Sequence, residues 1–358
     1  MSRIQTLQII GSKKLGGAES FFVRLHQAFN QTADVGSVAV VPHKSELLHQ
    51  LAAPATTCAM RSVFDPFSRL SLSSLIRKER PDIVQTWMGR ATRSVSLRPG
   101  KGPVHVARLG GFYNPDHYRH VHSLVGNTRG ICDFLIRNGY PSERVHFISN
   151  FVPAPQPVDA AIRQQWKTRL GLGDDLVIFA LGRLHPNKAF DTLLDAFSVL
   201  PKEINGRRVQ LLLAGDGHLA DALKDQARKS VAASRVHFLG WQSDPAPFFA
   251  LADLFVCPSR HEPLGNVILE GWAHGVPVVS TRSDGALELI TDGRDGLLTN
   301  IDAREELSAA MHQLLTAPAD QKEAMVTAGR QTLEHRFGQA TIVSAYRSLY
   351  EQLLGGVS

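Results

Sequence analysis

The sequence predicts an α/β protein of two domains, each with a parallel β-sheet covered by helices on both faces. The chain has 358 residues, more than one ordinary hydrophobic core holds. Short apolar runs alternate with helix-period segments, which is the pattern of parallel strands joined by helical crossovers. Three prolines lie within residues 150–157, and we interpret this stretch as the linker between the domains.

The predicted strands of the first half are short apolar runs followed by turns or helix-period segments. They cover residues 6–10, 38–41, 82–87, 104–109, 123–126 and 145–148. Helices are predicted at residues 21–29 and 72–79. A glycine-rich loop with Gly16 and Gly17 joins the first strand to the first helix, and such a loop lets a phosphate or sugar approach the backbone. The alternative for this loop is a plain tight turn.

The strand at residues 104–109 leads into a segment rich in glycines, aromatic rings and polar side chains. Ligands of parallel sheets bind at the carboxyl ends of the strands, so this segment is a candidate site for an acceptor substrate. Its candidate contacts are Arg108, Gly110, Asn114 and His117. The alternative for His117, as for His120 and His122, is a solvent-exposed histidine on a helix.

The second half repeats the pattern. Strands are predicted at residues 176–181, 209–214, 236–241, 254–258, 277–280 and 296–298, and helices at 162–170, 248–253, 305–315 and 339–354. The strand at 176–181 delivers two cations, Arg183 and Lys188, to its carboxyl end. Two cations there can neutralise a diphosphate leaving group, a task that a metal held by an Asp-x-Asp motif performs in other enzymes. The sequence contains no Asp-x-Asp, so we expect no metal cofactor; the alternative is a loop with two solvated charges.

Two carboxylates eight positions apart, Glu262 and Glu270, follow the strand at residues 254–258. We predict a helix entered at Pro263, whose unpaired N-terminal amides form an anion site. These amides belong to Leu264, Gly265, Asn266 and Val267. Eight residues span at most ~12 Å along a helix, so the carboxylates suit the two ends of an extended ligand such as a nucleotide diphosphate sugar. The alternative is an amphipathic helix with two solvated carboxylates.

These segments resemble the retaining glycosyltransferases of family GT4, which have the GT-B fold. The family's Glu-x7-Glu motif matches Glu262 and Glu270, and its Gly-Gly-x-Glu loop matches residues 16–19. Its Gly-Arg-x4-Lys-Gly signature matches residues 182–189, except that Ala189 replaces the last glycine. The resemblance implies two Rossmann-like domains facing across a cleft.

The resemblance also implies what each domain binds. Residues 1–153 would form the acceptor domain, with the terminal helix at 339–358 packed back on it, and residues 154–338 the donor domain. Relatives carry a His or Asp at the end of the strand at 104–109, where this chain has Arg108 and Leu109. The resemblance therefore assigns no catalytic residue to the first domain.

In the second domain, the resemblance assigns a role to each matched residue. Arg183 and Lys188 would stabilise the departing diphosphate, Glu262 would orient the donor sugar, and Glu270 would hold the ribose. The amides of residues 264–267 would bind the diphosphate. Further donor contacts are expected at Gly16, Gly17, Gly215, Leu239 and Trp241. For Trp241 the alternative is packing between the domains.

The implied function is transfer of a hexose or N-acetylhexosamine, with retention of configuration, from a nucleotide diphosphate sugar. A UDP-sugar is favoured as donor, and a glycolipid or oligosaccharide of bacterial surface glycan or lipopolysaccharide synthesis as acceptor. Two alternatives stay open: a sugar-nucleotide epimerase of the same fold, and a non-catalytic sugar-nucleotide binding protein. The paired cations and the two carboxylates favour catalysis, because binding alone does not require stabilisation of leaving-group charge.

Composition and charge limit the location and the partners. No apolar run reaches the ~18 residues of a membrane span, and the apolar stretch within residues 1–17 is too short for a signal peptide. Cys58, Cys132 and Cys257 are scattered and form no Cys-x2-Cys pair, so neither a zinc site nor a disulfide framework is expected. We therefore expect a cytoplasmic protein.

The net charge of +6 is unevenly distributed. Residues 1–165 hold 20 Lys and Arg against 10 Asp and Glu, a charge of +10, and the remainder holds 19 against 23, a charge of −4. A basic first half favours an anionic partner. No RRM, helix-turn-helix or zinc-finger pattern is present, so we expect no nucleic acid. We expect instead an anionic membrane surface or a phosphorylated glycolipid in it, and a peripheral position on the inner face of the cytoplasmic membrane.

Overall fold

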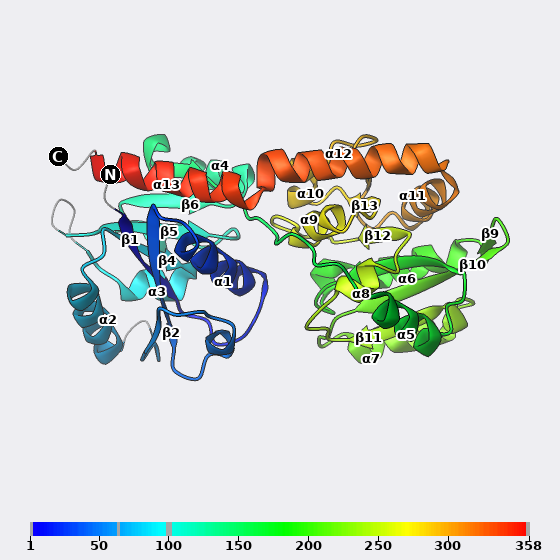
Figure 1. Cartoon of the computed structure of the whole chain (residues 1–358), viewed down its shortest axis with the longest axis horizontal. Helices are drawn as coiled ribbons and strands as arrows, with labels where there is room; N and C mark the ends of the chain where they lie inside the picture. Colours follow the sequence, from blue (N-terminus) through cyan, green and yellow to red (C-terminus); the bar gives the residue numbers. More distant parts are fainter. Residues whose placement is uncertain (1–2, 63–64, 98–101, 356–358) are drawn as a thin grey trace. The chain divides into compact units, whose positions relative to one another are not determined.

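The structure, a computed structural model, describes residues 3–62, 65–97 and 102–355. The chain forms two compact units (Figure 1). Unit 1 consists of Met1–Phe151 and Phe337–Ser358, and unit 2 of Val152–Arg336. The boundary at residues 151 and 152 lies inside the proline-containing stretch 150–157, and the chain returns to unit 1 for its last helix.

Unit 1 contains a seven-stranded sheet in the order β3-β2-β1-β4-β5-β6-β7. The strands are β1 (Ile4–Ile10), β2 (Val35–Pro42), β3 (Ala55–Cys58), β4 (Ile83–Trp87), β5 (Val104–Leu109), β6 (Ser123–Gly126) and β7 (Val145–Phe147). Every pair of neighbours is parallel, so the carboxyl ends of all seven strands meet at one edge. The sequence predicted six of these strands and missed β3, because this edge strand is mostly exposed and has no apolar run.

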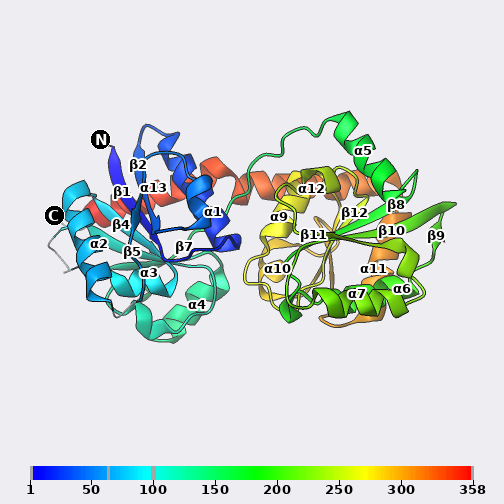
Figure 2. The ribbon, with the colours of Figure 1, turned by 90° about the horizontal axis from the view of Figure 1, so that it is seen from below.

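Helices cover both faces of this sheet (Figure 2). On one face, α1 (Gly17–Asn30) and α13 (Gln339–Gly355) bury a shared core. On the other face lie α2 (Pro66–Glu79), α3 (Met88–Ser94) and α4 (Arg129–Arg137). Short 3-10 turns complete the unit: η1 (Glu46–His49), η2 (Pro115–Tyr118) and η3 (Ser142–Arg144). The ring of Phe29 on α1 meets Tyr346 on α13 edge to face at 5.7 Å, so the terminal helix is part of the hydrophobic core of unit 1.

Unit 2 contains six parallel strands in the order β11-β10-β8-β12-β13-β14, with β9 antiparallel to β10. The strands are β8 (Leu176–Leu181), β9 (Glu203–Ile204), β10 (Arg207–Ala214), β11 (Val236–Gly240), β12 (Leu254–Cys257), β13 (Val278–Thr281) and β14 (Leu297–Thr299). The six parallel strands were predicted. The two-residue strand β9 is too short to produce a periodic signal.

One face of the second sheet packs on α6 (Phe190–Val199), α7 (Ala220–Lys229) and α11 (Arg304–Thr316). On the other face, Phe179 of β8 and Phe255 of β12 pack with Phe249, the last residue of α8 (Ala246–Phe249). The remaining elements are α5 (Ala160–Leu170), η4 (Pro186–Lys188), η5 (Ala233–Arg235), α9 (Asn266–Ala273), α10 (Asp284–Leu289) and α12 (Ala319–Phe337). The helix α12 was not predicted. It packs on α9 through Gly329, where any side chain would collide with the ring of Trp272.

The predicted entry of α9 at Pro263 is wrong. The helix begins at Asn266, because Gly265 directly before it has φ +93°, a left-handed conformation that interrupts a right-handed helix. Glu270 is therefore about one turn inside the helix rather than two. Among the described residues, no helix is both long enough and apolar enough to cross a bilayer.

Candidate active site

The loop after β8 places Lys188 at the carboxyl edge of the second sheet. The start of this loop is fixed by the Leu184 amide, which donates to the Asp216 carbonyl at 2.9 Å. The short turn η4 then leads to Ala189, which has φ +48° and is fully buried. This is the position where the family signature has glycine, and the left-handed backbone explains why glycine suits it.

The loop after β12 carries Glu262 and is held by hydrogen bonds from β13 and α10. Thr281 donates its hydroxyl to the Ser259 carbonyl at 2.5 Å. The Gly285 amide donates to the Glu262 carbonyl at 2.8 Å. A side chain at Gly285 would overlap the backbone of Leu264. The loop therefore rests directly on α10, and its shape depends on a glycine there.

Lys188 and Glu262 form an ion pair that joins the two loops. Their side chains are only 24% and 12% exposed, and the Ser259 hydroxyl lies 3.5 Å from the same carboxylate oxygen. Burial by itself lowers the pKa of Lys188, but the attraction of the Glu262 carboxylate outweighs it, so the pKa is raised above its usual value. Lys188 is thus held as a cation in a partly desolvated place, where its charge acts strongly on a nearby anion.

A second set of contacts, centred on Arg260, locks the same loops together. Arg260 donates to the Asp191 carboxylate at 2.9 and 2.6 Å and to Asp302 at 2.9 Å. It also donates to the Pro186 carbonyl at 2.8 Å. The hydrogen bonds to Asp191 and then to Asp302 raise the pKa of Arg260. Sequence reasoning missed this residue, since nothing in the pattern shows that a cation beside the Glu-x7-Glu motif meets carboxylates from two other segments.

Arg183 lies in the first loop but takes no part in these contacts. Its side chain is exposed, and it forms no hydrogen bond or ion pair with any residue that the structure describes. Its positive charge disfavours protonation of Lys188 slightly, which places the two cations within electrostatic reach of each other. Such a pair is suited to a ligand with more than one negative charge.

The remaining predicted donor contacts of unit 2 lie on α9 and at the ends of β10 and β11. Asn266, Val267 and Glu270 are half-buried on α9, whereas Leu264 and Gly265 are buried. At the end of β11, the Leu239 carbonyl accepts from Gln242 Nε2 at 2.7 Å.

Gly215 and Trp241 differ in what the structure explains of them. Gly215 has φ +141°, and any side chain there would overlap the Gly182 carbonyl. The packing of two strand ends therefore accounts for this glycine. Trp241 is 65% exposed.

The candidate contacts of unit 1 are spread over its sheet edge. Gly16 precedes the first turn of α1, which begins at Gly17. Asn114 is exposed and caps η2 by accepting from the Asp116 amide at 3.0 Å. His117 is half-buried and lies 3.2 Å from Arg93 Nη1, and Gly110 is half-buried.

Arg108, a candidate acceptor contact by sequence, is a buried core residue of unit 1. It is 2% exposed, and its guanidinium lies 4.6 Å from the ring centroids of both Phe21 and Trp87. Its Nε donates to Tyr346 Oη at 3.1 Å, and another nitrogen donates to Asn150. The whole of β5 is buried, so a charged residue on it has to find its partners inside the core.

No group of three or more His, Cys, Asp or Glu side chains suited to a metal ion occurs among the described residues. Within the described part of the site, Arg183 and Lys188 in the loop after β8 supply positive charge to an anionic ligand.

Comparison with known proteins identifies the family. Residues 175–317, which include both loops, match the family described as Glycosyl transferases group 1. The lipopolysaccharide core biosynthesis glycosyltransferase LpsE of Rhizobium meliloti (strain 1021) is 35% identical over 341 residues, which are 94% of this chain and 96% of the relative. The chain belongs to the group 1 glycosyltransferase family. LpsD, which bears the same description in the same strain, is 30% identical over 355 residues, covering 94% of this chain and 95% of the relative.

The fold agrees with this family. The crystal structure of Anabaena Alr3699/HepE in complex with UDP and glucose has a TM-score of 0.82 and 20% identity, covering 98% of this chain and 100% of that chain. The two Rossmann-like parallel-sheet domains are those of the GT-B fold. The family membership makes this group 1 glycosyltransferase an enzyme of the hexosyltransferase class.

Proposed function

We propose that this glycosyltransferase transfers a hexose or N-acetylhexosamine from a nucleotide diphosphate sugar to a glycolipid or oligosaccharide of the lipopolysaccharide core. Unit 2 binds the donor and unit 1 the acceptor. The similarity to LpsE and LpsD over nearly the whole chain supports this acceptor class. Retention of configuration is proposed from the Glu-x7-Glu motif, with the acceptor hydroxyl attacking on the face that the diphosphate leaves.

The observation that carries the donor assignment is the meeting of Lys188 and Glu262 at the carboxyl ends of β8 and β12. A diphosphate placed beside Lys188 and Arg183 meets two cations, and their attraction grows as negative charge develops on the leaving group. Glu262 forms an ion pair with Lys188, and we assign it the further role of orienting a hydroxyl of the sugar.

The rest of the donor is assigned to neighbouring residues. The amides of residues 264–267 receive the diphosphate, and Glu270 on α9 receives the ribose. Leu239 and Trp241 lie at the end of β11, where an exposed indole can stack on the base. Gly215 supports the donor site through the packing of the β10 and β8 ends. Gly16 and Gly17, at the start of α1, stay proposed donor contacts because a glycine-rich loop lets a phosphate or sugar approach the backbone.

We propose UDP as the nucleotide and no metal cofactor. The UDP bound in the Anabaena structure of the same fold supports the first point. Arg183 and Lys188 support the second, because they supply the positive charge that a metal would otherwise bring to the diphosphate.

We further propose a cytoplasmic location with peripheral attachment to an anionic membrane. Helix α2 supports this attachment, since Phe67 and Leu70 are 74% and 64% exposed on it. Arg69 lies between them in the sequence, and Arg77 and Lys78 follow in the last turn. Exposed apolar side chains beside cations suit the interface of a bilayer with anionic lipids.

The decisive experiment measures nucleotide release from UDP-, GDP- and ADP-sugars with and without truncated lipopolysaccharide core oligosaccharides. If the enzyme transfers sugar, nucleotide should be released only when donor and acceptor are both present. The new linkage should have the same anomeric configuration, α or β, as the donor. Release without an acceptor, with an epimerised sugar as product, would indicate the epimerase. Donor binding in calorimetry without release under any condition would indicate a binding protein.

A further inference from the structure

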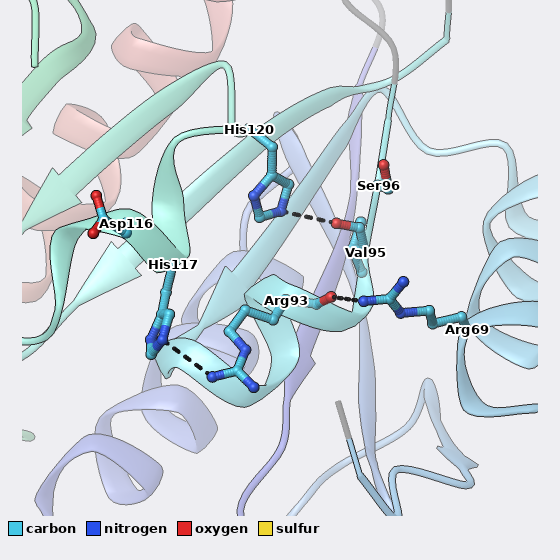
Figure 3. Close-up of a pocket in the computed structure, with 7 residues that line it drawn as sticks. All are labelled: Arg69, Arg93, Val95, Ser96, Asp116, His117 and His120. Atoms are coloured by element: carbon cyan, nitrogen blue, oxygen red, sulfur yellow. Dashed lines mark hydrogen bonds between the residues drawn. The ribbon is translucent and has the colours of Figure 1, made fainter. Parts of the chain in front are cut away.

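Two adjoining pockets in unit 1 share the residues Arg93 and His117. The first has a volume of about 360 Å³ and is also lined by Arg69 and His120 (Figure 3). The second has a volume of about 430 Å³ and adds Arg61, Gly89 and Arg90 to the two shared residues. We call both together the basic pocket. It lies wholly within unit 1.

The basic pocket lies at the edge of the sheet where ligands of parallel α/β folds bind. Arg61 comes shortly after β3, the residues from Gly89 to Arg93 follow β4, and His117 follows β5. Chain segments from three strand ends therefore converge on it, as expected at the carboxyl edge of such a sheet.

The described lining of the basic pocket has four arginines and one carboxylate, that of Asp116. Asp116 lies 3.4 Å from Arg119, which is not part of the lining. Arg61, Arg69 and Arg90 form no ion pair within the part of the chain that the structure describes. This surplus of positive charge is what an anionic ligand would neutralise.

Two of these arginines are oriented by single hydrogen bonds that leave most of their donors available. Arg69 Nη2 donates to the Arg93 carbonyl at 3.3 Å, as Figure 3 shows. Arg90 Nη1 donates to the Gly11 carbonyl at 3.2 Å, and its stem packs against Gly11. A guanidinium has five N–H donors, so each can still bind an oxyanion.

Two polar side chains near Gly89 bear on what the basic pocket can bind: His117, which lines it, and Tyr118, which follows His117 in the sequence, is buried and is not part of the lining. His117 Nε2 lies 3.2 Å from Arg93 Nη1; a guanidinium only donates, so this nitrogen accepts and the proton is on Nδ1. Next to Nδ1, the missing side chain of Gly89 leaves a space: a methyl group there would lie 3.6 Å from His117 Nδ1 and 3.5 Å from Tyr118 Oη. Tyr118 is fully buried, and its hydroxyl has no hydrogen-bond partner among the described residues.

We propose that the basic pocket binds a phosphate monoester carried by the acceptor, so that the enzyme selects a phosphorylated glycan. Arginine forks bind the oxygens of a tetrahedral dianion through paired N–H donors, and His117 Nδ1–H adds a neutral donor. This inference deepens the proposed function and rests on it, because it assigns a chemical class to the acceptor in unit 1.

The test separates this pocket from the donor site by variants in each. Glucose 6-phosphate, glucose and inorganic phosphate are titrated by calorimetry into the wild-type chain saturated with UDP, into Arg61→Gln/Arg90→Gln, and into Arg69→Gln. Arg77→Gln is the matched control, since it removes one exposed charge from the same helix as Arg69 outside the pocket. Thermal unfolding of each variant checks that it is folded.

We expect glucose 6-phosphate and inorganic phosphate to bind the wild type and Arg77→Gln, and glucose not to bind. Each lost arginine should weaken phosphate binding by about 10-fold and leave UDP affinity unchanged. Arg183→Ala, titrated without bound UDP, should show the opposite pattern, with weakened UDP binding and unchanged phosphate binding to the basic pocket. No phosphate binding to the wild type, or equal binding to the pocket variants, would overturn the proposal.

A membrane lipid is the other source of a phosphate, and a second measurement separates the two. The variant Arg61→Gln/Arg90→Gln is sedimented with phosphatidylglycerol vesicles; Arg69→Gln is not used here, because Arg69 lies on α2, the helix proposed to attach to the membrane. Vesicle binding equal to that of the wild type, together with lost glucose 6-phosphate binding, supports an acceptor phosphate. Lost vesicle binding with no affinity of the wild type for glucose 6-phosphate would overturn it in favour of a lipid headgroup. Loss of UDP-sugar turnover in every chain, with phosphate binding intact, would instead count against the proposed function.

Discussion

The ion pair between Lys188 and Glu262 permits a prediction that tests stability and chemistry together. Removing one partner of a buried ion pair costs about 3–5 kcal/mol, because the other charge is left without a partner. Here the Lys188 side chain is 24% exposed, so water reaches the pair and the cost should fall to about 2 kcal/mol. We expect this loss for Lys188→Met and for Glu262→Gln, and a smaller loss than the sum for the double variant.

The measurement is urea unfolding of the four proteins of this double-mutant cycle. A coupling energy of at least about 1 kcal/mol is expected, against about 0.5 kcal/mol or less for residues that do not interact. Turnover should behave differently: each single variant should lose about 100-fold or more in kcat, and the double variant should recover none of it. Additive stability losses would show that the pair does not exist in solution.

The pH dependence of the coupling follows from the raised pKa of Lys188. A cation whose pKa is raised in the folded state contributes stability fully below its unfolded pKa, which is 10.5. The coupling energy should therefore be constant from about pH 6 to pH 9 and should decline only as the pH rises above the unfolded value. A decline already at pH 8 would contradict the direction of this shift.

Four further predictions concern the metal, the loop support, a buried histidine and the membrane. Arg183→Ala should lower kcat/KM by about 100-fold, whereas excess EDTA should leave wild-type turnover unchanged; inhibition by EDTA that Mg²⁺ reverses would contradict metal independence. Gly285→Ala should lower the free energy of unfolding in urea by at least about 2 kcal/mol and weaken UDP binding, because the new methyl group collides with the neighbouring loop backbone. The control is Gly293→Ala, at a position with open space but a φ of +79°. This variant should lose stability but keep its affinity for UDP. Burial and two neighbouring histidines lower the pKa of His105 to about 3. The free energy of unfolding should therefore keep its full value above pH 6.5 and decrease as the pH falls below it, by up to about 1.4 kcal/mol per pH unit. His105→Gln should flatten this dependence of the unfolding free energy on pH between pH 7 and pH 5. Phe67→Ser should reduce sedimentation with anionic vesicles, and wild-type binding should weaken as salt rises; equal binding to neutral vesicles at every salt concentration would refute the membrane attachment.

The parallel strands could be predicted from the sequence because they are buried. In β8 and β12 every residue but the last of β8 is buried, so each strand appears as a continuous apolar run. The edge strand β3 lacks that signal and was missed. The same reasoning placed Arg183 and Lys188 correctly in the loop after β8, since the position of a strand also fixes the position of the loop at its end.

The contacts between distant segments could not be predicted. Lys188 and Glu262 are 74 positions apart, and their meeting depends on β8 and β12 being neighbours in the sheet. Sequence patterns show which residues follow the end of a strand, but they do not show the order of the strands in the sheet. Arg108 shows the opposite limit: its charge suggested a surface role, whereas the partners that make burial tolerable, Tyr346 and Asn150, come from the last helix and the end of unit 1.

The central proposal is that a diphosphate binds in unit 2 beside Lys188 and Arg183 at the start of α9. A crystal structure of the chain with UDP tests it most directly. The predicted result is a diphosphate within hydrogen-bonding distance of both side chains and of the amides of residues 264–267. A nucleotide bound elsewhere, or bound there with both cations directed away from its phosphates, would contradict the proposal.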